Sequence, residues 1–391
     1  MTVWDELTGQ SGAIAIFRAA AADSTLGNSP IGDSAMTHSW LITGPPGSGR
    51  SNLAYAFATA LLSPAVTGGV GNPDGDEATR RQVAARTHPD LAVLSTEGVI
   101  IKMDDVRRLV SSSNFSPSVS RYRVIVIEDA DRMQERTSNV LLKALEEPPP
   151  RTVWILCAPS EADLLPTIRS RVRTVRLRVP TVAEVAELIA LRDGVDIATA
   201  TRAARESQSH IGMAHRLATN EDARRRRQQT IEIALGIHTV SGAVIAAAKL
   251  LELAGEDARA ITEERDAEER ESALRSLGIE PGGTIPPALR AQLRTLEEDQ
   301  KRRATRSLRD GIDRIMVDLL SLYRDILLLQ LDARTGPINL AILSQLTSAS
   351  AASTAAETLA TMDAIATART RIDGNVAPAL ALEAMLISTA R

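Results

Sequence analysis

Short apolar runs alternate with helical patterns along roughly the first 178 residues. Four nearly continuous runs stand out: SWLIT at 39–43, LAVL at 91–94, VIVI at 124–127 and VWILCA at 153–158. Runs of this length predict strands that are covered on both faces. Helical patterns lie between them, and such strand–helix alternation predicts a parallel sheet with helices on both sides.

A fifth strand is expected with a different pattern. Apolar and polar residues alternate in the order Thr174, Val175, Arg176, Leu177, Arg178 and Val179. This period of two predicts one buried face and one face in water.

The pattern changes at Pro180. Residues 181–217 predict short helices, and from about 219 onward every periodic segment is helical, including an amphipathic helix through 312–327. The expected fold class is therefore α/β plus all-α. We expect an α/β domain over 1–178, a small helical domain over 179–218 and an all-α domain over 219–391.

Two segments of the helical half leave alternatives open. GIEPGGTIPP at 278–287 is interpreted as a surface loop inside one helical domain, with an interdomain linker as the alternative. ARRRRQ at 223–228 is interpreted as a solvated helix face, with a phosphate-binding patch as the alternative.

Composition narrows the class of protein. The 391 residues carry 45 basic and 49 acidic side chains, with 44% apolar and only 2% aromatic residues, which is typical of a globular chain with an aliphatic core. No apolar run approaches the ~18 residues of a membrane span, and the N-terminus lacks a secretory pattern. The single cysteine, Cys157, excludes an internal disulfide framework. We expect a cytoplasmic protein without membrane contact.

The most informative motif follows the first strand and opens a helix. Glycines in such a loop let backbone N–H groups surround phosphate, and the helix N-terminus adds positive potential. The candidate nucleotide-binding residues are Gly44, Pro45, Pro46, Gly47, Ser48, Gly49, Arg50 and Ser51. Ser51 is the residue placed to reach magnesium.

Two features depart from a competent ATP site. Arg50 stands where a lysine is usual, and the forked guanidinium is no conservative replacement for a compact ammonium. After the third strand the order is Glu128 then Asp129, whereas a Walker B motif has Asp then Glu. A displacement of about 1 Å can cost roughly a hundredfold in rate. We expect little or no intrinsic ATPase activity, and leave binding of ATP or ADP with magnesium open.

The motifs resemble those of the AAA+ clamp-loader subunits of bacterial DNA polymerase III. The matching segments are WDELTGQ (4–10), HSWLITGPPGSGRS (38–51), THPDL (87–91), RYRVIVIEDADRM (121–133), NVLLKALEEPPPRTVWIL (139–156) and IRSRV (168–172). The resemblance is strong over 4–217 and looser beyond. It implies a RecA-like AAA+ P-loop domain, a helical lid and a C-terminal helical collar for oligomerisation over the three expected domains.

The resemblance also implies partners and a role. Such subunits form a hetero-pentamer with gamma/tau-type and delta-type subunits, which places a sliding clamp on primed DNA within a nucleotidyltransferase holoenzyme. DNA is contacted through phosphates. In these rings the arginine of a Ser-Arg-Cys motif points into a neighbour's ATP site. Here that arginine is Arg171, with Val172 in place of the cysteine. An arginine finger is worth ~10³–10⁵ in rate.

Family members often carry a four-cysteine zinc module, which this chain lacks. Its positions fall near Ser63 and at Asp74, Glu77 and Arg80, so the soft ligands are missing and we predict no zinc.

Nucleotide-sensing positions depart as well. Ala158 and Pro159, with Ser160 one step on, stand where a sensor Thr or Asn is expected, and the lid sensor falls on His215 or Arg216. The leading hypothesis is a non-motor subunit that lends Arg171 to its neighbour. The alternatives are an ATP-hydrolysing motor subunit of the gamma/tau type, or a related AAA+ remodeller, and then another P-loop enzyme such as a nucleotide kinase.

Overall fold

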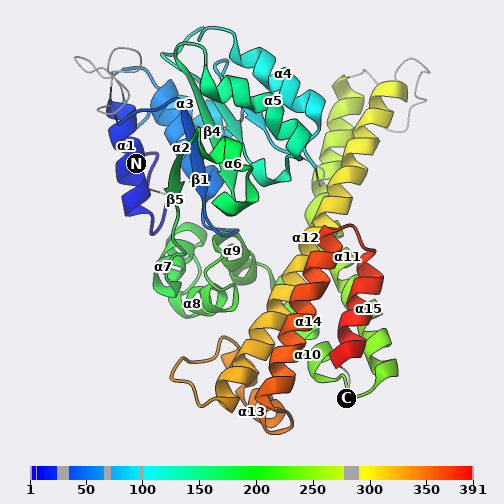
Figure 1. Ribbon diagram of the computed structural model, residues 1–391. Coiled ribbons are helices and arrows are strands. Elements are labelled where there is room, and N and C mark those ends of the chain that lie inside the picture. Colours follow the sequence, from blue (N-terminus) through cyan, green and yellow to red (C-terminus); the bar gives the residue numbers. More distant parts are fainter. Residues whose placement is uncertain are drawn as a thin grey trace. The chain divides into compact units, whose positions relative to one another are not determined.

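The computed structural model describes residues 2–5, 7–23, 35–65, 72–96, 100–276 and 290–389 (Figure 1). By internal contacts the chain divides into two units, Met1–Thr219 and Asn220–Arg391. Each unit is described by itself. The division into three domains after residues 178 and 218 stays a prediction.

A five-stranded sheet forms the centre of the first unit, in the order β2-β3-β4-β1-β5. The strands are β1 (Ser39–Thr43), β2 (Leu91–Leu94), β3 (Arg123–Ile127), β4 (Thr152–Ala158) and β5 (Arg173–Arg176). All neighbouring strands are parallel, which confirms the predicted α/β class. Since β1 lies between β4 and β5, its carboxyl end is flanked by theirs.

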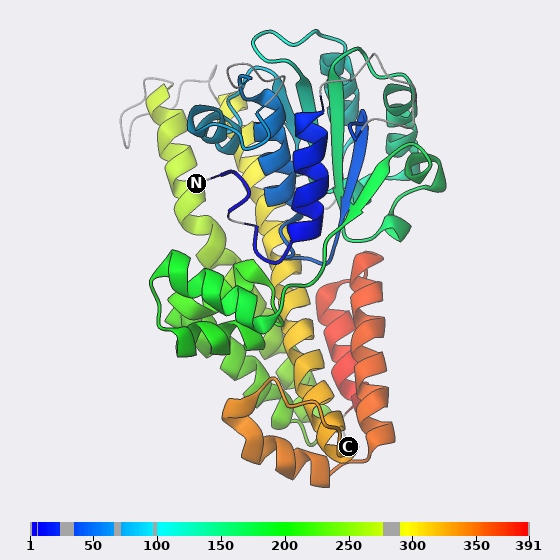
Figure 2. The ribbon, with the colours of Figure 1, turned by 90° about the vertical axis from the view of Figure 1, so that its left-hand side faces the viewer.

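Helices cover both faces of this sheet (Figure 1, Figure 2). One face carries α1 (Ser11–Ala22), α2 (Arg50–Leu62) and α3 (Glu77–Ala84); the other carries α4 (Met103–Ser113), α5 (Glu135–Glu146) and α6 (Pro166–Arg169). Short 3-10 turns follow β3 (η1, Ala130–Arg132) and β4 (η2, Glu161–Asp163). The first face is centred on the rings of Phe17, Trp40 and Phe57, with centroids 4.4–5.5 Å apart.

Burial differs between central and edge strands. β1 and β4 are buried throughout, as their apolar runs predict. β2 is an edge strand, and only its first residue, Leu91, is fully buried, so the prediction of cover on both faces is wrong there. At the other edge Val175 and Leu177 are buried, but Val179 is 55% exposed. The predicted alternation fails at Val179 because β5 has ended and the chain turns toward the next helices.

Three short helices complete the first unit, as predicted for 181–217: α7 (Val182–Asp193), α8 (Ile197–Glu206) and α9 (Ile211–Thr219). Thr181 begins α7 with a capping box, in which its side chain and that of Glu184 each bond to the other's backbone N–H. We refer to these three helices as the lid.

The second unit is helical throughout its described part. It contains α10 (Glu221–Leu235), α11 (Val240–Ser276), α12 (Arg290–Gln330), η4 (Leu340–Ile342), α13 (Leu343–Ala351), α14 (Ala355–Asp373) and α15 (Pro378–Thr389). The long helices α11 and α12 lie side by side, and the core is aliphatic (Figure 1). The loop expected at 278–287 lies outside the described residues. No described helix is long and apolar enough to cross a membrane.

The arginine run on α10 does not form a solvated face. Arg226 pairs with Asp257 on α11 at 3.0 Å, and Arg227 pairs with Asp318 on α12 at 3.0 Å. Arg227 is only 8% exposed. The solvated-face interpretation is therefore wrong for these two side chains, because α10 packs against helices that present carboxylates to it.

Candidate functional site

The glycine-rich loop Gly44–Ser51 joins the carboxyl end of β1 to the start of α2, in the context that its motif predicts. Gly47 and Gly49 have φ of +77° and +92°, which a side chain would strain. The Gly44 N–H donates to the Pro159 carbonyl at 3.2 Å, which ties the loop to the end of β4. The backbone therefore has the form of a phosphate cradle at a helix N-terminus.

Arg50 turns back over this cradle. Its Nη1 donates to the Gly44 carbonyl oxygen at 2.5 Å. A hydrogen bond to a charged group contributes about 1.5–3 kcal/mol. Any phosphate group entering the loop competes with that carbonyl for the Arg50 guanidinium. Ser51, the expected magnesium contact, is half-buried in the first turn of α2.

The lid contacts the loop through His210. A Cβ added to Gly47 would lie 2.3 Å from the His210 ring, so glycine is required there for close approach. The Ile211 N–H donates to the Gly47 carbonyl at 3.4 Å. Of the two lid sensor candidates, His215 instead pairs with Asp193 inside the lid, with 2.7 Å between Nδ1 and Oδ2. His210 lies in none of the motifs of the sequence analysis, so it was not predicted to contact the loop.

Gln10 joins the loop to the chain that leads into the lid. This side chain is 4% exposed, and its amide donates to the Arg178 carbonyl at 2.9 Å and to the Ser48 carbonyl at 3.5 Å. The Arg178 N–H donates back to the Gln10 oxygen at 3.2 Å. Gln10 ends the segment 4–10 that carries part of the family resemblance.

Glu128 is already bound by two other side chains. The Tyr55 hydroxyl of α2 donates to its Oε1, and Arg86 Nη2 lies 2.8 Å from the same oxygen. Burial raises the pKa of Tyr55, and the bond to Glu128 and its charge raise it further, so the phenol stays protonated. The neighbouring carboxylate, Asp129, has another partner: its Oδ1 lies 4.0 Å from Arg132 Nε. The Glu128 carboxylate therefore forms a structural bridge between β3 and α2.

The charged candidates do converge at the carboxyl end of the sheet. Burial raises the pKa of Cys157 in β4 to about 12, with Arg50 opposing the rise and Glu128, Asp129 and Asp131 adding to it. Burial also raises the pKa of Asp131, and the neighbouring Asp129 charge contributes. The structure thus gathers Arg50 and these carboxylates near one strand end.

Ser160, Ser63 and Asp74 make structural contacts, the last two at positions that correspond to the family's zinc module. The Ser160 hydroxyl caps η2 by accepting from the Ala162 N–H at 3.2 Å. Ser63 accepts from the Asp76 N–H at 3.0 Å, and Arg18 pairs with Asp74 at 2.6 Å. Among the described residues, no three or more His, Cys, Asp or Glu side chains gather where they could hold a metal ion. The absence of zinc stays a prediction.

Arg171 lies just after α6, and its side chain is 31% exposed. Its Nε donates to Glu146 Oε1 at 2.6 Å, and its Nη1 donates to the Thr167 carbonyl at 2.7 Å and the Ser170 hydroxyl at 2.9 Å. Glu146 is the last residue of α5, Thr167 lies in α6, and Ser170 caps the C-terminal end of α6. Among the described residues, the hydrogen bonds of Arg171 thus connect it to these helices and not to the loop at 44–51.

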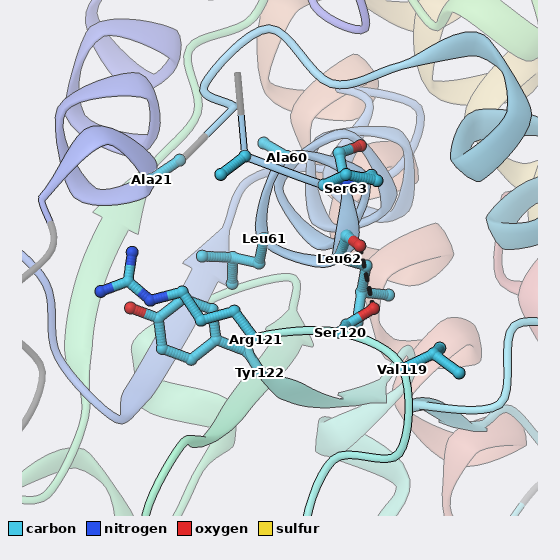
Figure 3. Close-up of a pocket in the computed structure, with 11 residues that line it drawn as sticks. Ala21, Ala60, Leu61, Leu62, Ser63, Val119, Ser120, Arg121 and Tyr122 are labelled. Atoms are coloured by element: carbon cyan, nitrogen blue, oxygen red, sulfur yellow. Dashed lines mark hydrogen bonds between the residues drawn. The ribbon is translucent and has the colours of Figure 1, made fainter. Parts of the chain in front are cut away.

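A cavity of about 210 Å³ lies at the opposite end of α2 (Figure 3). Its mainly apolar wall includes Ala21, Ala60, Leu61, Val119, Arg121 and Tyr122. Beside it, the Ser120 hydroxyl donates to the Leu62 carbonyl at 2.9 Å (Figure 3). A helix of 13 residues spans about 20 Å, so this cavity is separate from the glycine-rich loop.

Comparison with known proteins finds similarity to subunits of DNA polymerase III over part of the chain. Residues 25–181 match the profile of the family described as "DNA polymerase III, delta subunit". DNA polymerase III subunit delta′ of Pseudomonas aeruginosa is 38% identical over 138 residues, which cover 34% of this chain and 41% of the relative. The delta′ subunit of Haemophilus influenzae is 34% identical over 144 residues, 37% of this chain and 43% of the relative. The chain thus spans about two fifths of the length of these relatives.

A relative with a different subunit name also matches. DNA polymerase III subunit gamma/tau of Mycobacterium tuberculosis is 31% identical over 137 residues, 35% of this chain and 23% of the relative. A solved gamma-subunit-related protein from Thermotoga maritima covers 96% of this chain and 98% of its own, with 16% identity and a TM-score of 0.41, and adds nothing to the fold described above.

Proposed function

We propose that this chain, which through residues 25–181 belongs to the delta-prime family of DNA polymerase III subunits, is a non-motor clamp-loader subunit in DNA replication. Its partners are gamma/tau-type and delta-type subunits in a hetero-pentamer. Its task is to brace that assembly and to lend Arg171 to the ATP site of a neighbouring motor subunit. The assembled loader then places the sliding clamp on primed DNA, which it contacts through phosphates.

The contrast between two arginines carries this proposal. Arg50 is turned onto the Gly44 carbonyl of its own loop, whereas Arg171 is held at the surface by α5 and α6. A guanidinium that reaches a neighbour's γ-phosphate stabilises charge in the transition state. Both guanidinium groups are bound within the chain, but Arg50 faces its own loop, whereas Arg171 lies 31% exposed beside α5 and α6, where a neighbouring subunit can reach it once these contacts open.

Hydrolysis at the loop itself is expected to be negligible. The loop backbone and Ser51 fit a nucleoside triphosphate with magnesium, which supplies the phosphate and metal charge when bound. A phosphate bound in the loop would compete with the Gly44 carbonyl for the Arg50 guanidinium. Glu128, at the metal-side position of the motif, is bound by Tyr55 and Arg86 and is therefore poorly placed to support a magnesium ion.

The second candidate function is an ATP-hydrolysing motor subunit of the gamma/tau type. The similarity to the gamma/tau subunit favours it, as do the loop glycines and Ser51. The two functions differ in whether the isolated chain turns over ATP.

Two measurements test the proposal. We expect the purified chain to show no ATP turnover above background, while turnover comparable to a motor subunit would support the alternative. In a loader reconstituted with its motor subunits, Arg171→Ala should lower DNA-stimulated ATPase activity by at least a hundredfold at the adjoining site. The matched control is Arg169→Ala, an exposed arginine of α6. Equal activity of the Arg171→Ala loader and the unmodified loader would refute the finger role.

A further inference from the structure

We propose that Glu146 is a positioning residue that holds the Arg171 guanidinium within the chain and must release it before the finger can reach a neighbour's triphosphate. The inference rests on the proposed function of Arg171. It adds a control on when the arginine is available, set by a carboxylate of the same subunit.

The hydrogen bonds of Arg171 leave it little capacity for a second partner. A guanidinium side chain has five N–H donors. Nε and Nη2 both contact Glu146 Oε1, and Nη1 donates to the Thr167 carbonyl and the Ser170 hydroxyl. Four donors are therefore occupied, and a bidentate contact with a phosphate needs two. Arg171 cannot keep all these bonds and also grip a γ-phosphate.

Glu146 occupies a position where a helix does not favour a carboxylate. It is the last residue of α5, at the negative end of the helix dipole. The backbone changes direction at once, with Glu147 outside the helix and Pro148 after it. The Arg171 guanidinium compensates this charge, so the two side chains stabilise each other while no partner is present.

The contact is weak enough to open. The side chains of Arg171 and Glu146 are 31% and 46% exposed, and ion pairs in such positions contribute about 0–1 kcal/mol. A triphosphate carries several negative charges and competes well for the arginine. At an upper value of about 1 kcal/mol, Glu146 reduces the available fraction of Arg171 up to about fivefold.

The effect should therefore appear in the ATP concentration that the neighbouring site requires. Once triphosphate has drawn Arg171 away, Glu146 no longer competes, and the maximal rate is unchanged. Glu146→Gln keeps the shape and removes the charge. We expect it to lower the KM for ATP by about two- to fivefold with an unchanged kcat.

The experiment uses the loader reconstituted with the full chain and steady-state ATPase kinetics. The matched control is Glu147→Gln, which changes the adjacent exposed carboxylate and should leave both constants unchanged. Glu146→Gln combined with Arg171→Ala should behave as Arg171→Ala alone, because Glu146 acts through the arginine. If Glu146 had only a structural role, the effect of Glu146→Gln would persist in the loader that carries Arg171→Ala.

The outcomes separate this inference from the function on which it rests. If Arg171→Ala has no effect, the finger role itself fails. If Arg171→Ala abolishes stimulation but Glu146→Gln leaves KM unchanged or lowers kcat, only the holding role of Glu146 fails. An effect of Glu146→Gln that persists without Arg171 overturns it as well.

Discussion

Replacing Asp90 should destabilise the first unit, and more strongly than the substitutions of Ser118 or Asp131 described below. Asp90 belongs to the THPDL segment that carries part of the family resemblance, and it is completely buried. Its carboxylate accepts four hydrogen bonds of 2.6–2.9 Å from Ser118, Val119 and Ser120, three of them from backbone N–H groups. One buried side chain thus fixes the turn that leads into β3.

The loss in free energy of unfolding depends on how well the N–H groups that lose the Asp90 carboxylate find other acceptors. Each bond to a charged acceptor contributes about 1.5–3 kcal/mol, but burying a carboxylate costs several kcal/mol. Ser118 and Val119 are exposed, so their N–H groups turn to water in the variant, whereas that of Ser120 is half-buried. We expect a loss of about 2–4 kcal/mol in the free energy of unfolding.

Tryptophan fluorescence during urea unfolding isolates this unit. Trp4, Trp40 and Trp154 are the only tryptophans of the chain, and all lie before residue 219. With a slope near 3 kcal/mol per M, the midpoint should fall by about 1 M. Ser118→Ala removes only the hydroxyl donor to Asp90 and should cost no more than about 1 kcal/mol.

The pH dependence provides a second readout. Burial alone raises the pKa of Asp90, but the N–H groups of Ser118, Val119 and Ser120 outweigh it, so the pKa lies below its ordinary value. The unfolded chain then takes up this proton first, and the contribution is present above the ordinary pKa near 3.8 and lost as pH falls through the folded value. The midpoints of wild type and Asp90→Ala should converge in acid. Equal midpoints at neutral pH would refute the reasoning.

Three further changes test other parts of the chain. Burial and Asp129 raise the pKa of Asp131, so its charged form opposes folding above that pKa; Asp131→Asn should match or exceed wild-type stability at pH 7, and a lower urea midpoint would contradict this. Arg227→Ala removes the buried bonds that Arg227 donates to Asp318 and Asn339 and should cost the second unit about 1–3 kcal/mol, measured by circular dichroism during urea unfolding. Cys157, buried with a pKa near 12, should react with a thiol reagent only after unfolding, and rapid labelling of the native chain would show the burial to be wrong.

The sequence pattern is sufficient to predict the strands and the glycine-rich loop, but it does not predict which groups bind the site residues. Apolar runs locate β1, β3 and β4 because burial on both faces leaves no room for polar residues, and a fourth run locates the less buried edge strand β2. Arg50 and Glu128 are visible as departures at fixed motif positions. Arg50 binds the Gly44 carbonyl, and Glu128 binds Tyr55 and Arg86. The two contacts of Glu128 depend on how α2 and the segment after α3 pack beside β3, which the local sequence pattern does not show.

Charge runs are the least informative signal. ARRRRQ at 223–228 has the composition of a solvated face, yet Arg226 and Arg227 are held by Asp257 and Asp318. Those carboxylates lie 31 and 91 residues along the chain. Periodicity within one helix carries no information about acidic groups on helices packed against it.

The loop glycines have a structural reason that does not involve phosphate. A Cβ on Gly44 would lie 2.7 Å from the Ser48 hydroxyl and 2.8 Å from Leu177 Cβ, and one on Gly47 would overlap the His210 ring. Contacts under 3.0 Å force a shift of the backbone or its neighbours. The glycines are therefore needed to close the loop on itself and to admit the lid, whether or not a nucleotide binds.

The glycine pattern therefore predicts the backbone conformation of the loop, but it does not show that the loop binds or hydrolyses a nucleotide. The loop, the N-terminal segment and the chain around the lid meet in the first unit. Here the chain's own groups make those connections, because Gln10 joins Ser48 to Arg178 and His210 covers Gly47. Both partners of each of these contacts belong to the first unit. The glycine pattern is thus evidence for the fold, and the side chains at positions 50 and 128 are the evidence about catalysis.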